Sequence, residues 1–164
     1  MIQKIPTPIT PVRMDKETRR ITLAYFEHRS TVDYIGAVQG IPVCFDAKEC
    51  RTSNFPIQNI HEHQVVFMRD FEAQGGVAFL ILYFTSADRY FYLPYEQLAV
   101  FWNRSKTGHA KHFKIEELDT QYELTCNGCY IHYLEAFRKI LIHVSSKFEG
   151  EKMTLNWDRP NDIT

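Results

Sequence analysis

A stretch in the N-terminal third of the chain, residues 30–49, limits most strongly what this sequence can fold into. Two runs of β-forming residues flank the dipeptide Gln39-Gly40. A glycine in a short loop between two such runs is a hairpin signal. Counting outward from a two-residue loop places Asp33 directly opposite Asp46. The sequence therefore predicts a β-hairpin that carries two facing carboxylates.

The alternation of side chains along a strand divides this hairpin into two faces. The polar face is expected to carry Thr31, Asp33, Asp46 and Lys48, and the face toward a core is expected to carry Val32, Phe45 and Ala47. Two facing carboxylates repel each other across a sheet. A divalent cation between them removes the repulsion, and oxygen donors of this kind suit Mg²⁺, with Mn²⁺ as the alternative.

The lysine two residues beyond Asp46 adds a cation to the predicted site. Lys48 could orient an attacking water and stabilise negative charge that develops on a phosphate. Two carboxylates, a metal and a lysine are the minimal apparatus for metal-dependent phosphodiester hydrolysis. Two other interpretations stay open: a solvated polar face without chemistry, and a longer loop around Gly40 that would shift the count.

The size and composition of the chain describe one folded domain. Its 164 residues are 45% hydrophobic and 14% aromatic, and the formal net charge is −1. Bulk charge therefore does not indicate a nucleic-acid partner. The longest apolar run, residues 77–84, has the length of a buried strand and not of a membrane span. With no signal peptide in the sequence, we expect a cytoplasmic protein that does not contact a membrane.

The first 31 residues have a charge pattern of their own, with six Lys and Arg against three Asp and Glu. Three prolines favour an extended segment, and residues 19–26 are expected to return as a second strand. The ribbon would end in Tyr25 and Phe26, which could stack on unpaired bases while the basic residues contact phosphates. The alternative is that both rings belong to the core. The basic candidates on this ribbon are Lys16, Arg19 and Arg20.

A helix is expected after the hairpin, with Asn59 as its N-cap and Gly75-Gly76 at its end. Gln64 lies on its otherwise apolar face, either as a boundary residue or as part of a site. We expect no metal site from His61 and His63, because residues two apart do not share a helix face. Further expected elements are strands at 77–85 and 89–93, helices at 95–103, 114–118 and 132–142, and a polar tail at 147–164.

Four cysteines are present, and the pair Cys126 and Cys129 has the spacing of half a zinc site. A second pair with metal-ligand spacing is missing from the sequence. We therefore expect a turn at Asn127-Gly128 and no zinc.

Several motifs resemble, in order, those of the RecU family of Holliday junction resolvases, within the PD-(D/E)xK nuclease superfamily. They are K-x-PTPI, AYF, ST-x-DY-x-G, FDAKE and FPIQNIHEHQ, over roughly residues 4–70, with a looser likeness toward residue 140. The resemblance implies a restriction-endonuclease-like α/β fold, in which helices flank a mixed β-sheet and an N-terminal stalk projects. We expect a nuclease domain over residues 1–146 that contains the stalk at about 4–29.

The resemblance also implies a function and residue roles. It implies a Mg²⁺-dependent endonuclease that acts as a homodimer and cuts four-way DNA junctions in symmetric pairs. Asp33 and Asp46 would hold the metal with oxygen help from Thr31 and Gln64, and Lys48 would support the attacking water. Lys4, Tyr25 and Phe26 match family positions that contact DNA, and Lys16 or Arg19 would replace a basic residue of the stalk.

The sequence departs from the family in its first residues. RecU-like chains carry an N-terminal helix with an acidic residue before the K-x-PTP segment, whereas this chain starts almost at that segment. Two alternatives follow: a junction-binding protein that has lost cleavage, and a related nuclease that acts on duplex DNA.

Overall fold

The fold is built on one six-stranded mixed sheet. A computed structural model describes residues 1–6, 9–26, 31–127 and 130–139. The sheet has the strand order β1-β4-β5-β7-β8-β10. The strands are β1 (Ile2–Lys4), β4 (Tyr34–Val38), β5 (Ile41–Cys50), β7 (Val77–Phe84), β8 (Arg89–Pro94) and β10 (Glu123–Leu124).

The predicted hairpin is present as β4 and β5, and its predicted register is confirmed. Val38 pairs with Ile41, and the ladder ends with Tyr34 opposite Phe45. Asp33 directly precedes this ladder, and its backbone N–H donates to the side chain of Asp46. Gln39 and Gly40 have φ values of 51° and 86°. Positive φ at both loop positions is the turn that fits the twist of a two-residue hairpin.

The predicted division of the hairpin into two faces is wrong at two positions. Val32 is fully buried, but it packs in the cluster that contains Cys44 and not in the cluster that contains Phe45. The reason is that β4 begins at Tyr34, so strand alternation does not extend back to Val32. Ala47 is exposed, because the core on its face of the sheet ends before it.

The centre of the sheet is β7, which pairs in parallel with β5 and antiparallel with β8. Seven of its eight residues are buried, as expected for a strand that is covered on both faces. Both predicted strands, 77–85 and 89–93, are therefore confirmed to within one residue.

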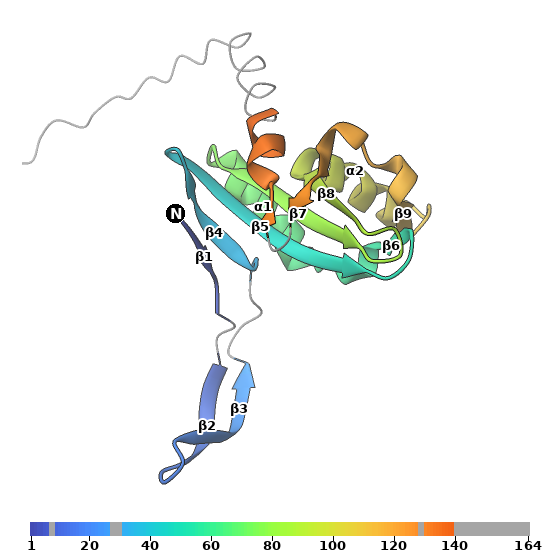
Figure 1. Cartoon of the computed structure of the whole chain (residues 1–164). Helices are drawn as coiled ribbons and strands as arrows, with labels where there is room; N and C mark the ends of the chain where they lie inside the picture. Colours follow the sequence, from blue (N-terminus) through green and yellow to red (C-terminus); the bar gives the residue numbers. More distant parts are fainter. Residues whose placement is uncertain (7–8, 27–30, 128–129, 140–164) are drawn as a thin grey trace, which may run out of the picture.

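Helices cover both faces of the sheet (Figure 1). Helices α1 (Glu62–Ala73) and α2 (Tyr95–Lys106) pack with the larger core cluster, which includes Met68, Leu80 and Leu98. A helix at 133–139 contributes Ala136 and Phe137 to the cluster on the opposite face. The predicted α/β class with a mixed, helix-flanked sheet is confirmed, and the predicted helix at 114–118 is a 3₁₀ turn, η2 (Ile115–Glu117).

Strands β2 (Ile9–Asp15) and β3 (Arg20–Phe26) form a separate antiparallel ribbon. Figure 1 draws this ribbon apart from the six-stranded sheet. A stalk over residues 4–29 is not evident as such: Lys4 belongs to β1 in the main sheet, and the connections at 7–8 and 27–30 lie outside the described residues.

Two smaller strand pairs and two further 3₁₀ turns complete the described chain. They are β6 (Asn54–Pro56) with β9 (His112–Lys114), β11 (Cys126–Asn127) with β12 (Tyr130–Ile131), and the turns η1 (Ile57–Asn59) and η3 (Thr120–Tyr122). The predicted tail at 147–164 and Cys129 lie outside the described residues. Among the residues that the structure describes, every helix is too short or too polar to serve as a membrane span.

Replacement of Gly36 by alanine is expected to displace the edge strand β1. A Cβ atom at Gly36 would collide with the carbonyl oxygen of Met1 and lie 2.6 Å from Cα of Ile2. We expect Gly36→Ala to lower the free energy of unfolding by about 1–3 kcal/mol in urea denaturation. Ala37→Ser, at the exposed neighbouring position, is the control and should stay within about 0.5 kcal/mol of the wild type. An unchanged midpoint for Gly36→Ala would contradict the close packing of β1.

Candidate active site

A fully buried carboxylate lies at the centre of the candidate site. The side chain of Asp46 is 0% exposed and accepts hydrogen bonds from three donors. Its Oδ1 accepts from the backbone N–H of Asp33 at 2.6 Å, and its Oδ2 lies 2.8 Å from Nζ of Lys48. The side-chain amide of Gln64 donates a short hydrogen bond to the same Oδ2. A buried charge requires such compensation, because an unpaired carboxylate would be far less stable in the interior.

The three donors come from different elements, and the local fold explains why they meet. Lys48 follows Asp46 by two residues on β5, so both side chains project from the same face of the sheet. Asp33 directly precedes β4, next to the last pair of the hairpin ladder, and its backbone N–H reaches the Asp46 side chain. Gln64 lies in the first turn of α1 and is 6% exposed.

The start of α1 fixes the orientation of the Gln64 amide. The backbone N–H of His61 donates to Oε1 of Gln64 at 3.1 Å, which leaves the amide nitrogen to face Asp46. The predicted N-cap, Asn59, is wrong, since Asn59 belongs to η1 and His61 is the N-cap. Asn59 ends the 3₁₀ turn that precedes the helix, and spacing alone did not reveal this turn.

The charged groups of the site differ in their exposure to solvent and in their partners. Lys48 is 20% exposed, so its ammonium is accessible while Asp46 is not. Asp33 is half-buried, and among the described residues its carboxylate has no hydrogen bond or ion pair. Burial, and then the nearby carboxylates of Glu72 and Asp46, raise the pKa of the Cys44 thiol to about 12. Cys44 therefore stays neutral at physiological pH and adds no charge beside Asp46.

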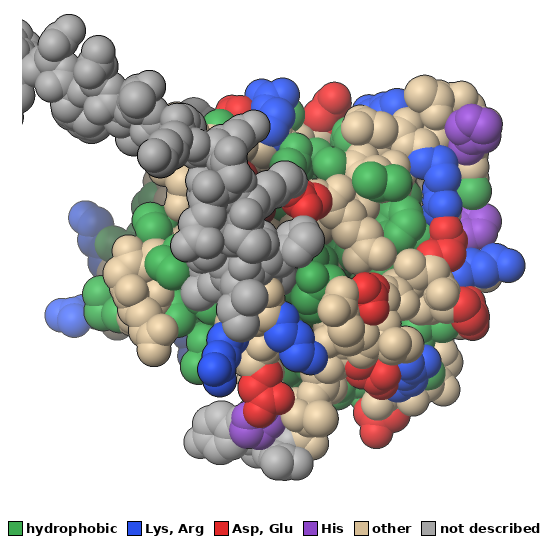
Figure 2. All heavy atoms as spheres, turned by 90° about the horizontal axis from the view of Figure 1, so that it is seen from above, with side chains coloured by type: hydrophobic (Ala, Val, Ile, Leu, Met, Phe, Trp, Pro, Cys, Tyr) green, Lys and Arg blue, Asp and Glu red, His purple; other side chains and the backbone are tan. Residues whose placement is uncertain are grey.

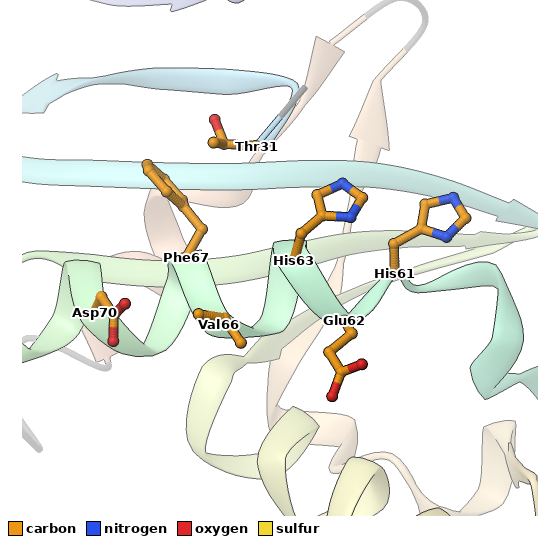
Figure 3. A pocket seen from close by; sticks show the side chains of 7 residues that line it. All are labelled: Thr31, His61, Glu62, His63, Val66, Phe67 and Asp70. Carbon is orange, nitrogen blue, oxygen red and sulfur yellow. The ribbon is translucent and has the colours of Figure 1, made fainter. Parts of the chain in front are cut away.

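An open groove of about 540 Å³ runs along the start of α1 (Figure 3). It is lined by Thr31, His61, Glu62, His63, Val66, Phe67 and Asp70. The rings of His61 and His63 stack in parallel, with centroids 5.4 Å apart. The two rings lie on one side although the residues are two apart, because His61 is an extended N-cap residue outside the helix. That the pair holds no metal stays a prediction.

Sequence reasoning placed Asp33, Asp46, Lys48 and Gln64 in one site, and the structure brings these four together. Thr31 lies in the adjoining groove, and no described contact joins it to Asp46. The sequence did not predict that His61 and His63 line a groove beside this site. One signal could have located the start of the helix. In a capping box, a Gln or Glu side chain accepts from the backbone N–H of the N-cap residue three positions earlier, as Gln64 accepts from His61.

The predicted DNA-contact residues are spread over two elements. Lys4 is exposed at the end of β1, Lys16 and Arg19 lie at the exposed tip of the β2–β3 ribbon, and Arg20 pairs with Asp15 in the ribbon ladder. Tyr25 is 57% exposed, so the alternative that it belongs to the core is wrong. The side chain of Phe26 lies outside the described residues. None of these residues contacts the Asp46 cluster among the described interactions.

The donor set of the site fits a hard divalent cation that is completed by water and substrate. Within the described ranges, three or more His, Cys, Asp or Glu side chains nowhere gather closely enough to hold a metal by themselves. Mg²⁺ is commonly bound through one or two carboxylates together with substrate phosphates and waters. Asp33 offers such oxygens from a half-buried carboxylate, and Asp46 would join it by exchanging one of its present donors, Lys48 or Gln64, for the ion.

Comparisons with known proteins agree on one family. The model of the family "Recombination protein U" matches residues 1–139. A Holliday junction resolvase RecU from Bacillus cereus (strain B4264) is 37% identical over 131 residues, which are 77% of this chain and 66% of the relative. The same-named protein of Pediococcus pentosaceus is 39% identical over 148 residues, 86% of this chain and 73% of the relative. That of Oenococcus oeni is 40% identical over 115 residues, 68% of this chain and 58% of the relative. The chain thus spans about two thirds of the length of the curated relatives it matches.

Removal of the Gln64 amide is expected to destabilise the fold. Gln64→Leu keeps the size of the side chain but leaves Oδ2 of Asp46 and the backbone N–H of His61 each without one partner. We expect the free energy of unfolding to fall by about 1–3 kcal/mol, measured by urea denaturation. The matched control is Gln58→Leu at an exposed position of η1. Equal stability of the two variants would show that the Gln64 contacts contribute nothing.

Proposed function

The chain belongs to the RecU family, and on that basis we propose that it is a metal-dependent endonuclease that resolves four-way DNA junctions. The observation that supports this most strongly is the Asp46 cluster. A fully buried carboxylate, its lysine and a neighbouring aspartate lie together, and these are the groups that metal-dependent phosphodiester hydrolysis would use. The names of the relatives supply the substrate, a Holliday junction.

In this proposal each residue of the cluster has a distinct role. Asp33 and Asp46 would hold Mg²⁺, with Mn²⁺ as the alternative, and the hydroxyl of Thr31 would be a further oxygen donor. Gln64 would lend its oxygen only if its amide turned over, because Oε1 accepts from the backbone N–H of His61. The chemistry that the ion supplies is activation of water and neutralisation of charge on the phosphate. Gln64 also holds Asp46 in place through its amide N–H, which is the contact described above.

Lys48 acts on the reacting groups directly. Its ammonium is held 2.8 Å from Asp46 and is partly open to solvent, so it can meet a phosphate without a change of backbone. From there it orients the attacking water and stabilises the charge that develops on the phosphate oxygens.

The β2–β3 ribbon is the proposed stalk that contacts the junction. Lys16, Arg19 and Arg20 supply positive charge near its tip, and the exposed ring of Tyr25 is available to stack on an unpaired base. Phe26 beside it and Lys4 on β1 are the other proposed contacts. Two symmetric cuts require two sites, so we propose a homodimer with two-fold symmetry. Two expectations stay predictions: that the protein is cytoplasmic, and that it binds no zinc.

Cleavage of a synthetic four-way junction tests this proposal. We expect the wild type, with Mg²⁺, to introduce paired symmetric nicks and to prefer the junction over linear duplex of equal length. Lys48→Met should lower the single-turnover rate by about 10²- to 10³-fold, because a donor that stabilises the transition state is lost. Lys111→Ala, an exposed lysine remote from the cluster in sequence, is the control and should cleave as the wild type does.

The other outcomes distinguish the alternatives. Junction binding without nicks by the wild type would indicate a binding protein that does not cleave. Equal cleavage of junction and duplex would indicate a related nuclease of different specificity. Unchanged cleavage by Lys48→Met, with the fold intact by circular dichroism, would remove the role assigned to Lys48.

A further inference from the structure

We propose that the groove along α1 is a second phosphate subsite, in which His61 and His63 hold the DNA backbone next to the scissile phosphate. This inference rests on the proposed function, because it gives that function a further strand contact. Its two principal residues, His61 and His63, belong neither to the Asp46 cluster nor to the ribbon. The ligand is a phosphodiester group of the strand that is being cut.

The geometry of the two imidazoles is the first observation. Their rings are nearly parallel, with an interplanar angle of 12°, and both line the groove. Figure 3 shows the two rings projecting side by side in the same direction from the start of α1, while Glu62 between them points the opposite way. An imidazole has an N–H donor whether it is neutral or protonated. Two donors are therefore presented together on one wall of the groove.

The charge balance of the groove is the second observation. Two carboxylates line it, and each of them has a cation partner outside the groove lining. Glu62 lies 3.7 Å from Nζ of Lys106 on α2, and Asp70 lies 2.8 Å from the guanidinium of Arg69. These pairs reduce the repulsion that a phosphate would otherwise meet. The hydroxyl of Thr31 adds a third donor to the lining.

The connection to the Asp46 cluster is the third observation. His61 donates its backbone N–H to Gln64, and Gln64 donates to Asp46. The groove therefore begins one side chain away from the carboxylate that is proposed to hold the metal. A strand whose scissile phosphate lies at Lys48 would bring a neighbouring phosphate into this groove.

A contact of this kind fixes where the strand lies, and it carries no base sequence information. Phe67 and Val66 form the apolar part of the groove and would pack against a sugar. The structure thus assigns His61 and His63 as positioning residues for the cut strand.

Binding of modified junctions in EDTA tests the inference without any cleavage. The probes are four-way junctions that carry a neutral methylphosphonate at either of the two phosphates flanking each cut site. The variants are His61→Ser, which retains a good N-cap residue on a shorter side chain, and His63→Ala, which removes the donor, alone and together. His109→Ala, at an exposed histidine elsewhere, is the matched control. Circular dichroism and thermal unfolding verify that each variant is folded.

We expect the double variant to bind the unmodified junction about tenfold more weakly than the wild type, as for the loss of a hydrogen bond to a charged group. One of the two methylphosphonates should weaken wild-type binding by a similar factor and have little further effect on the double variant. His109→Ala should respond as the wild type does.

Two results would overturn the inference. One is a double variant that binds the unmodified junction as tightly as the wild type does, and the other is a methylphosphonate that weakens binding by the double variant as much as it weakens binding by the wild type. Failure of this inference can be distinguished from failure of the proposed function. A wild type that binds the junction but does not cut it contradicts the nuclease and leaves the subsite to be decided by these affinities. A wild type that does not bind the junction overturns both.

Discussion

The structure depends on one buried charge. Asp46 is fully enclosed in the sheet, and its carboxylate is stable there only because Lys48, Gln64 and the backbone of Asp33 supply donors. These donors come from three segments that are distant in sequence or lie in different elements. To satisfy Asp46, the hairpin register must be correct and the first turn of α1 must lie against β5. The same interaction thereby fixes the fold locally and assembles the candidate site.

The surrounding fold makes this arrangement rigid. β5 pairs with β4 as far as Phe45 and with β7 along its further course, so Asp46 and Lys48 project from the part of β5 that β7 holds. The helices α1 and α2 pack on the same face of the sheet, and the end of Lys48 stays partly exposed there. Preorganisation of this kind allows a site to stabilise charge without moving its own groups during the reaction. The groove with His61 and His63 extends the same face along α1.

The features that depend on short-range periodicity, such as the register of the hairpin, could be predicted from the sequence. A two-residue loop at Gln39 and Gly40 determines the register, so the juxtaposition of Asp33 and Asp46 could be counted. The sequence was insufficient where the chain leaves regular structure. Val32 precedes the strand and turns to the other core, and the 3₁₀ turn before α1 moves the N-cap to His61. The metal, the partner chain and the roles of individual residues are not encoded in periodicity, so those remained proposals.

The central claim is that the Asp46 cluster is a metal-binding centre whose parts are already in place. A titration of the ¹⁵N-labelled protein with Mg²⁺, followed by NMR, tests it most directly. The account predicts that the largest shifts occur at the backbone amide of Asp33 and the side-chain amide of Gln64, because both donate to Asp46. It also predicts that Asp46→Asn abolishes them. Shifts that are centred elsewhere, or that persist in Asp46→Asn, would contradict the account.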